Sequence, residues 1–258
     1  MRTLAVIPAR YASSRLPAKP LLKATGKFLI EHVYERAAQA RHIDQVVVAT
    51  DDARIESAVK SFGGNVVMTR DDHVSGTDRV AEVAQFQEAD IVVNLQGDEP
   101  MIESDALDFV ADLLVRHQQA AMATLATPLR NMEQYQNPNC VKVVVGELGQ
   151  ALYFSRSPIP YVRDGMPQFA HEPFQFFQHI GLYAYRREFL LKLAQTPATA
   201  LEQIEKLEQL RVLSLGQRIQ VGIVAQSSAG VDTPEDYQKF VAEWDRQQGQ
   251  TTERRQAA

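Results

Sequence analysis

The chain has 258 residues, of which 45% are hydrophobic and 23% are charged. This composition is that of an ordinary globular protein with a large core, and we expect one α/β domain with a subdomain. The formal net charge of −5 argues against a general nucleic-acid binder, because such proteins are more often basic. The single cysteine, Cys140, excludes an intrachain disulfide and is expected to be a small buried hydrophobe.

The sequence contains neither an apolar signal core near its start nor a run of about 18 apolar residues. We therefore expect a soluble, intracellular protein that does not bind membranes.

In the first part of the chain, short apolar runs alternate with segments of helical periodicity. The runs predict strands at 4–7, 45–50, 66–69 and 91–95, and the periodicity predicts helices at 29–41, from Asp51 or Asp52 to about 62, and from about 77. Such alternation indicates a doubly wound, mostly parallel sheet.

The pattern changes after a predicted helix at about 104–117. Further strands are expected at 122–126, 141–145, 151–154, 181–185 and 219–225, and further helices at 187–194, 201–215 and 233–244. A hairpin turn is expected at 146–149. Residues 156–177 are rich in proline, arginine and aromatics, which predicts a loop over the site. The polar segment 246–258 predicts a disordered tail.

Three strong cations, Arg10, Arg15 and Lys19, follow the first strand. The residues between them are small: Ala9, Ala12, Ser13, Ser14 and Ala18. Small side chains let backbone amides approach an anion, and the cations add charge-assisted hydrogen bonds, so we expect a triphosphate cradle. Residues 9–20 contain no glycine and match neither common phosphate loop. The alternative is a solvated basic loop.

Two acidic positions follow later strands. Asp98, in the segment 96–100, is expected to face the cationic loop across a crevice and to hold Mg²⁺, which binds one or two carboxylates plus substrate phosphates. Asp232, after the last strand, would be a second metal carboxylate. The alternatives are an ordinary turn at Asp98 and an ordinary helix start at Asp232.

The segment 72–79 offers a second polar cluster. Ser75, Gly76 and Thr77 can present amides and hydroxyls at a helix N-terminus, with Arg79 in the first turn, where a base edge or a phosphate could bind. An ordinary helix cap with a solvated arginine is the alternative.

A third polar group comes from the second part of the chain. Its members are Arg156, His179, Tyr183, Glu205, Glu208 and Gln209. Glu205 and Glu208 are three residues apart, so one helix would carry them on a shared face. The alternative is that this face is simply exposed to solvent. A lone strand histidine is more often structural than catalytic, and none of the six histidines has typical zinc-site spacing.

Taken together, these motifs closely resemble the 3-deoxy-manno-octulosonate (Kdo) cytidylyltransferase family. The matching segments run in order along the chain at 7–21, 48–51, 75–79 (Ser-Gly-Thr-Asp-Arg), 94–102 (with Gln-Gly-Asp-Glu-Pro), 151–156, 179–186, 207–211 and 230–236. The resemblance implies a nucleotide-diphospho-sugar transferase-like fold in a cytoplasmic homodimer. It also implies the reaction of CTP and Kdo, with Mg²⁺, to CMP-Kdo and diphosphate for lipopolysaccharide synthesis.

The resemblance implies one nucleotidyltransferase domain at 1–245, with a nucleotide-binding half at about 1–120 and a sugar-binding and dimerisation part at about 121–230. It also implies roles for residues at matching positions: catalysis by Arg10, Lys19, Asp98 and Asp232; nucleotide binding by Arg10, Ser13, Arg15, Lys19, Ser75, Arg79 and Gln96; sugar binding by Gln96, Arg156, His179, Tyr183, Glu205 and Gln209; metal binding by Asp98 and Asp232.

Two positions depart from the family pattern. Ala18 stands where the family usually has glycine, which predicts a stiffer loop, and Phe28 stands where it usually has proline, with little expected effect. A cytidylyltransferase for another acidic sugar, such as 8-amino-Kdo or a sialic acid, is the alternative within enzymes. A non-catalytic nucleotide-binding domain is the alternative outside them, while the missing glycine fingerprint disfavours a dehydrogenase.

Overall fold

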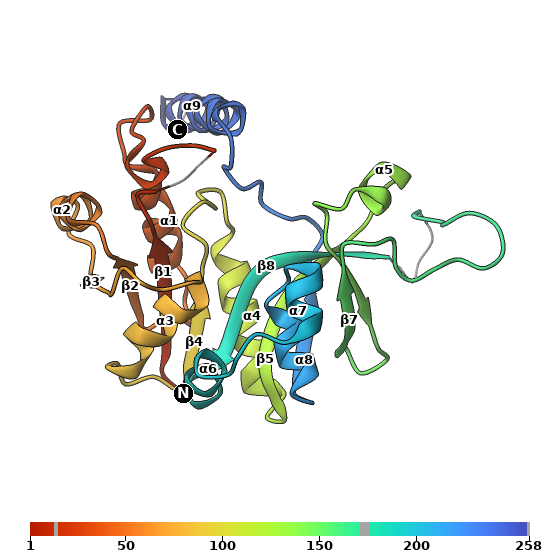
Figure 1. Cartoon of the computed structure of the whole chain (residues 1–258). Coiled ribbons are helices and arrows are strands. Elements are labelled where there is room, and N and C mark those ends of the chain that lie inside the picture. Colours follow the sequence, from red (N-terminus) through yellow and green to blue (C-terminus); the bar gives the residue numbers. More distant parts are fainter. Residues whose placement is uncertain (13–14, 171–175, 257–258) are drawn as a thin grey trace.

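The structure is a computed structural model that describes residues 1–12, 15–170 and 176–256, with side chains as far as residue 248. Helices and strands alternate along most of the chain (Figure 1). Their bounds are β1 (Thr3–Ala9), η1 (Lys19–Leu21), α1 (Leu29–Ala38), β2 (Gln45–Thr50), α2 (Ala53–Ser61), β3 (Val66–Met68), α3 (Gly76–Gln85), β4 (Ile91–Asn94), α4 (Ser104–Arg116), β5 (Ala120–Pro128), α5 (Met132–Gln136), β6 (Lys142–Val145), β7 (Ala151–Ser155), β8 (Phe177–Arg186), α6 (Arg187–Ala194), α7 (Ala200–Glu205), α8 (Gln209–Ser214), β9 (Arg218–Ile223) and α9 (Pro234–Gln256).

The strands form one sheet in the order β3-β2-β1-β4-β8-β5-β9. The pairs β3–β2, β2–β1 and β1–β4 are parallel, and so is β5–β9. Between these parallel parts lies β8, which is antiparallel to both β4 and β5. The predicted α/β class and mostly parallel, doubly wound sheet are therefore confirmed, with β8 as an antiparallel insertion.

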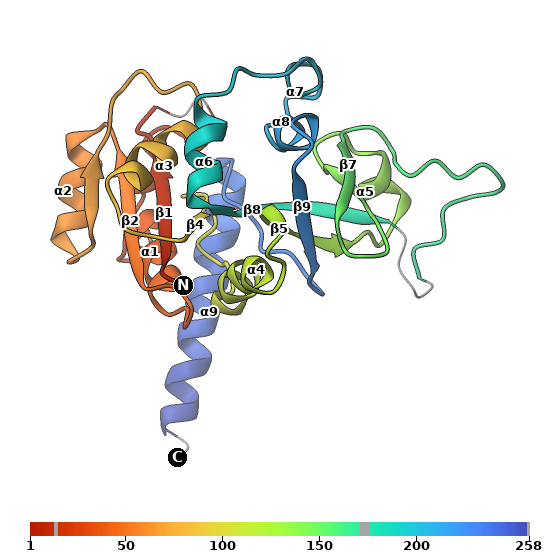
Figure 2. The same ribbon diagram turned by 90° about the horizontal axis from the view of Figure 1, so that it is seen from below.

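Helices cover both faces of the sheet (Figures 1 and 2). Along β1, Ala5 and Ile7 pack with α1, α2 and α4, whereas Leu4 and Val6 pack with α3, α6 and α8. A strand buried on both faces needs apolar side chains at consecutive positions. This is why the sequence of β1 is a continuous apolar run and does not alternate between apolar and polar residues.

A smaller β-containing part extends from the start of β8, outside the strand order given above. There β6 pairs antiparallel with β7 and with the first residues of β8. The loop after β7 projects away from β1 and β4 in both views, so the expectation of a loop over the site is wrong for the described residues 156–170 (Figures 1 and 2). Val162 and Phe169 of this loop instead pack in a separate cluster with Tyr135, Phe176 and buried Cys140. The hydroxyl of Tyr135 also donates to the carbonyl of Pro160, at 2.7 Å.

The single helix expected at 201–215 is two helices, α7 and α8. Lys206 ends α7 in the left-handed conformation, with φ of 54°. The break lets Arg211 donate through Nε to the Glu202 carboxylate, at 2.7 Å, so that a buried ion pair joins the two helices. Glu205 and Glu208 therefore do not share one helix face.

The expectation of a disordered tail at 246–258 is also wrong for the described residues 246–256, since α9 continues to Gln256, and the last two residues lie outside the described part. Arg246 pairs with Glu243 at 3.0 Å, and Gln247 donates to Glu243 at 3.1 Å. These contacts at spacings of three and four residues support the extra turns. No helix in the described ranges combines the length and the apolar character that crossing a membrane requires.

Candidate active site

The carboxyl ends of β1 and β4 lie side by side, because Val6 of β1 is in register with Asn94 of β4. The chain after β1 carries the cationic loop, and the chain after β4 carries Asp98. The ammonium of Lys19 contacts Asp98 Oδ2 at 2.8 Å. The prediction that Asp98 faces the cationic loop is thus confirmed.

Asp232 reaches the same place from the far end of the chain. The amide of Val231 donates to the carbonyl of Asp98 at 2.8 Å, and Ser228 Oγ donates to Glu99 Oε2 at 2.9 Å. Lys19 Nζ lies 3.2 Å from Asp232 Oδ1. One ammonium therefore contacts two carboxylates whose positions depend on main-chain and side-chain contacts between their segments.

Sequence reasoning assigned no role to Glu99, the neighbour of Asp98. The pKa of its carboxyl is raised to about 7, because burial and, to a smaller extent, the charge of Asp98 raise it more than the Ser228 hydrogen bond lowers it. Its contact with Ser228 joins segments more than a hundred residues apart, and such a contact leaves no local signal in the sequence.

Two cavities adjoin at this edge of the sheet. The first measures about 390 Å³, and its charged and amide lining residues are Arg10, Arg15, Lys19, Gln96 and Asp98. The second measures about 240 Å³, and its polar lining residues are Thr77, Gln96, Tyr183, Lys206, Glu208 and Gln209. Gly76 and Gln96 line both cavities, so the two form neighbouring compartments.

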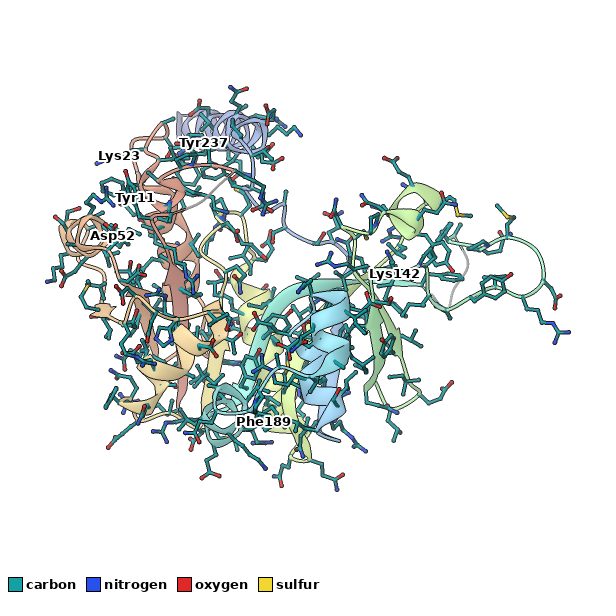
Figure 3. The ribbon with its side chains drawn as sticks, viewed as in Figure 1. Tyr11, Lys23, Asp52, Lys142, Phe189 and Tyr237 are labelled. Carbon is teal, nitrogen blue, oxygen red and sulfur yellow. The ribbon has the colours of Figure 1, made fainter. Side chains whose placement is uncertain are left out.

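The cationic loop is fixed to α2 through an aromatic contact. The guanidinium of Arg54 lies 3.2 Å from the centre of the Tyr11 ring and donates to both carboxylate oxygens of Asp52 (Figure 3 labels Tyr11 and Asp52). Ala18 has φ of 54°, a left-handed conformation that glycine adopts more easily, which accounts for the usual family residue there. Ser13 lies outside the described residues.

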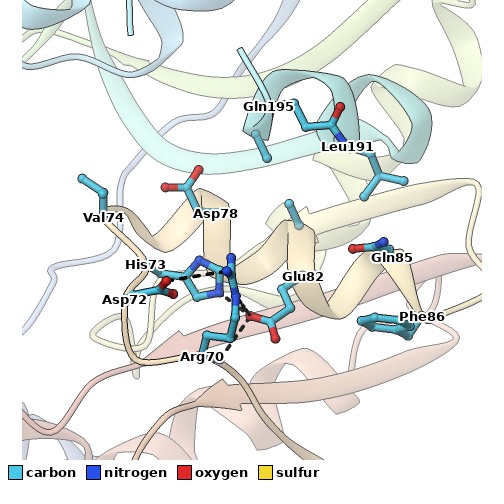
Figure 4. Close-up of a pocket in the computed structure, with 12 residues that line it drawn as sticks. Arg70, Asp72, His73, Val74, Asp78, Glu82, Gln85, Phe86, Leu191 and Gln195 are labelled. Atoms are coloured by element: carbon cyan, nitrogen blue, oxygen red, sulfur yellow. Dashed lines mark hydrogen bonds and ion pairs between the residues drawn. The ribbon is translucent and has the colours of Figure 1, made fainter. Parts of the chain in front are cut away.

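Arg10 is held from the other side by the segment before α3. Arg10 Nη2 donates to the carbonyl of His73 at 2.7 Å, and the His73 imidazole contacts the Glu82 carboxylate in a third cavity, of about 580 Å³ (Figure 4). The backbone amide of Arg70 donates to the same carboxylate at 3.2 Å. Burial alone raises the pKa of Glu82, but the bonds from His73 and Arg70 outweigh it and leave the pKa below its usual value.

His73→Ala is expected to raise the KM for a triphosphate substrate about fivefold, the equivalent of about 1 kcal/mol, with a smaller change in kcat. The backbone carbonyl of His73 orients Arg10, and the contact between the His73 side chain and Glu82 fixes the position of this segment. The substitution removes that contact. In an Arg10→Met background the same substitution should change KM little, because the interaction is already absent. Full additivity of the two effects would show that His73 does not act through Arg10.

The N-terminus of α3 carries Ser75, whose hydroxyl accepts from the Asp78 amide at 3.1 Å, as in an ordinary helix cap. Arg79 is fully buried and donates to Asp51 Oδ2 at 2.7 Å and to Thr69. The structure thus contradicts the expected direct nucleotide contact at Arg79. The side chain instead connects the ends of β2 and β3 to α3, because a buried guanidinium needs a carboxylate partner.

The second cavity presents amide and phenol groups. Tyr183 Oη lies 3.5 Å from Gln209 Oε1, and Gln209 Nε2 is buried without a hydrogen-bond partner among the described residues. Burial raises the pKa of Tyr183, which therefore stays protonated at neutral pH. A buried amide without a partner is costly, so an acceptor on a ligand would be bound favourably here.

His179 lies behind Tyr183, with 5.4 Å between ring centres, and its Nε2 lies 3.0 Å from Thr124 Oγ1. The single hydroxyl proton of Thr124 has the carbonyls of Ile180 and Leu182 as acceptors. His179 Nε2 is therefore the donor to Thr124, and Nδ1 is left as an acceptor. Burial lowers the pKa of His179 from 6.5 to about 3, so the ring is neutral at physiological pH.

This pKa predicts acid sensitivity. Below about pH 6.5 the unfolded chain binds a proton at His179 that the folded protein binds only near pH 3. The free energy of unfolding should therefore fall, by about 2 kcal/mol from this group, between pH 7.5 and pH 5. Urea titrations should show a shallower loss in His179→Gln and an unchanged loss in the partly exposed control His117→Gln. Equal losses in all three proteins would contradict the prediction.

Arg156 and Glu205 meet each other and do not line either cavity. The backbone amide of Arg156 donates to Glu205 Oε2 at 2.9 Å, and its guanidinium donates to the carbonyls of Glu205 at 2.8 Å and Pro138 at 3.0 Å. Ser155 Oγ donates to the other Glu205 oxygen at 2.5 Å. These contacts fasten α7 to the end of β7, next to Lys206 in the wall of the second cavity.

The donor groups fit a magnesium ion that arrives with a phosphate ligand. In the described ranges no three His, Cys, Asp or Glu side chains gather as a complete metal site. Asp98 and Asp232 supply two carboxylates around one cation position, which Lys19 Nζ takes in this structure. Mg²⁺ commonly uses one or two carboxylates together with substrate phosphates and waters, so the pair suits it.

A cationic loop after β1 faces Asp98, which follows β4, and Asp232, which follows β9, next to a polar cavity, and this arrangement suits a nucleotidyltransferase. The cytidylyltransferase family model matches residues 4–219. The 3-deoxy-manno-octulosonate cytidylyltransferase of Syntrophotalea carbinolica is 52% identical over 239 residues, 92% of this chain and 96% of the relative. That of Syntrophobacter fumaroxidans is 50% identical over 244 residues, 93% and 96% of the two chains. The chain belongs to the cytidylyltransferase family.

Solved structures agree with this membership. A CMP:2-keto-3-deoxy-manno-octonic acid synthetase complexed with CTP matches with a TM-score of 0.89 and 46% identity, covering 96% of this chain and 100% of that chain. A 4-diphosphocytidyl-2C-methyl-D-erythritol synthase from Anaerococcus prevotii, at 10% identity, has a TM-score of 0.62 over 95% of this chain and 99% of that chain. The second similarity concerns the fold alone.

Proposed function

We propose that this protein transfers CMP from CTP to the anomeric hydroxyl of Kdo, giving CMP-Kdo and diphosphate. The observation that carries the proposal is the pair of adjoining cavities, one lined by Arg10, Arg15 and Lys19 and the other by Tyr183 and Gln209, with Gln96 at their junction. The relatives at about half identity carry the name of this activity.

In this mechanism the Kdo hydroxyl oxygen attacks the α-phosphorus of CTP and releases its proton to solvent, the bond to the β-phosphate breaks, and diphosphate leaves. Arg10, Arg15 and Lys19 bind the triphosphate and neutralise the charge that develops on the leaving group. When bound, Mg²⁺ on Asp98 and Asp232 supplies further neutralisation of phosphate charge. Gln96, between the cavities, orients the two substrates toward each other.

The sugar is assigned to the second cavity. The phenol of Tyr183 and the free amide of Gln209 are donors for the carboxylate and hydroxyls of a sugar acid, while the neutral His179 ring supports Tyr183 from behind. Arg156 and Glu205 do not contact the sugar. Their contacts with each other hold the turn at Lys206, which lines the second cavity. Ser75 and Gly76 keep a nucleotide role through the amides at the start of α3.

The test is diphosphate release from CTP with and without Kdo and with and without Mg²⁺. Release that requires both Kdo and the metal is the expected result. Release with 8-amino-Kdo or a sialic acid but not with Kdo would keep the mechanism and replace the sugar. CTP binding without diphosphate release for any of these sugars would overturn the enzymatic function.

We also propose a cytoplasmic homodimer that serves lipopolysaccharide synthesis. Support for the dimer is the apolar surface of the smaller β part, where Leu148, Leu152, Tyr161 and Met166 are all more than half exposed. A particle mass of two chains by light scattering is expected, and a single-chain mass at micromolar concentration would contradict the dimer.

A further inference from the structure

Lys19 takes the position between the two carboxylates that suit a metal ion. Its ammonium lies 2.8 Å from Asp98 Oδ2 and 3.2 Å from Asp232 Oδ1. The Lys19 side chain is only 14% exposed, against 30% and 43% for the two acids. Most of the Lys19 side chain is therefore covered by the protein, unlike that of an ordinary surface lysine.

A divalent cation cannot share these oxygens with the ammonium. Mg²⁺ requires oxygen ligands at about 2.0–2.1 Å in near-octahedral geometry, and the protons of Lys19 point at the same oxygen atoms. Arg15 Nη2 adds a second positive charge 3.2 Å from Asp232 Oδ1. A free metal ion that approaches the pair is thus opposed by two cations of the protein.

The phosphate oxygens of a bound triphosphate can attract the Lys19 ammonium away from the two carboxylates. Lys19 lines the first cavity together with Arg10 and Arg15, so its ammonium needs only to move along the wall of the cavity to contact a phosphate. The flexible four-carbon stem allows this without movement of the backbone. The nucleotide would then free the carboxylates and bring the metal ion in one event.

We propose that Lys19 is an internal substitute for the metal ion, which keeps free divalent cations off Asp98 and Asp232 until the nucleotide binds. The site then takes metal and CTP together, as the metal–nucleotide complex. This inference rests on the proposed function, because it assumes that the two carboxylates hold the metal of that reaction.

The experiment measures Mn²⁺ binding without nucleotide, from the loss of the free-ion electron paramagnetic resonance signal. Lys19→Met is expected to bind Mn²⁺ at least about tenfold more tightly than the wild type, since a site that is open in a tenth of molecules loses tenfold in affinity. Lys19→Arg, which keeps a cation there, should stay weak. Lys23→Met removes the same charge from an exposed position nearby and should also stay weak.

Equal Mn²⁺ affinity of Lys19→Met and wild type would overturn the substitute role. Adding Asp98→Asn to Lys19→Met separates this result from the proposed function. Loss of the tight binding assigns the metal to the carboxylates, whereas unchanged tight binding shows that the ion is elsewhere and refutes the metal pair itself.

A measurement on the wild type covers the case in which Lys19→Met fails to fold. Mn²⁺ alone should leave its melting temperature unchanged, while Mn²⁺ with an α,β-methylene analogue of CTP should raise it above the analogue alone. Stabilisation by Mn²⁺ alone, at the same concentration, would refute the inference.

Discussion

Asp98→Asn is expected to lower kcat by about 10³-fold or more, because it removes an electrostatic contact that acts on the developing phosphate charge. The substitution keeps the size of the side chain but replaces the charged carboxylate, which Lys19 contacts at 2.8 Å, by an uncharged amide. Steady-state diphosphate release over a range of Mg²⁺ concentrations measures the effect, and higher Mg²⁺ should not restore the rate.

The control is Asp105→Asn, in which a surface acid that is 84% exposed loses the same charge. This variant should keep its activity within about a factor of two, since exposed pairs contribute little. A turnover number of Asp98→Asn close to that of the control would eliminate the proposed metal role of Asp98.

Arg79→Met is expected to lower the free energy of unfolding by about 3 kcal/mol or more. Removal of the guanidinium leaves Asp51 without the charge that it contacts at 2.7 Å, and breaking one side of a buried pair is strongly destabilising. Urea unfolding at constant pH measures the loss as a lower midpoint with an unchanged slope. Arg79→Lys, which keeps the charge but loses the second contact, should lie between.

The matched control is Arg116→Met, because the Arg116 side chain is 69% exposed and its guanidinium pairs with Asp112 at 3.5 Å. Its loss should be below about 0.5 kcal/mol. In the folded Arg79 variant the KM for CTP should stay near the wild-type value. A large rise in KM without a loss of stability would instead favour the direct nucleotide contact that the sequence suggested.

The first four strands and their helices were predictable because each carries its own signal. β1, β2 and β4 are buried on both faces and read as apolar runs, and α2 begins at a capping aspartate, Asp52, whose side chain accepts from the Arg54 amide. The position of Asp98 opposite Lys19 also followed, because parallel strands bring their carboxyl ends to one edge. Here local pattern and topology agree.

The errors come from contacts between distant segments. The Lys206 turn depends on Glu202 pairing with Arg211 and on Glu205 accepting from the Arg156 segment, none of which a helical pattern at 201–215 reveals. Arg79 is a charged residue in a polar motif, and only the presence of Asp51 beneath it explains its burial. Sequence spacing describes one element at a time, so it cannot say which partner a side chain will choose.

Asp232 stands 213 residues after Lys19, the ammonium that it contacts. During synthesis, at about 5–20 residues per second, the nascent chain therefore carries Lys19 and Asp98 for about 7 to 27 seconds before the ribosome adds Asp232. Through that interval Lys19 has only one of its two carboxylates. If both acids are needed, a nascent chain that ends before Asp232 cannot turn over CTP.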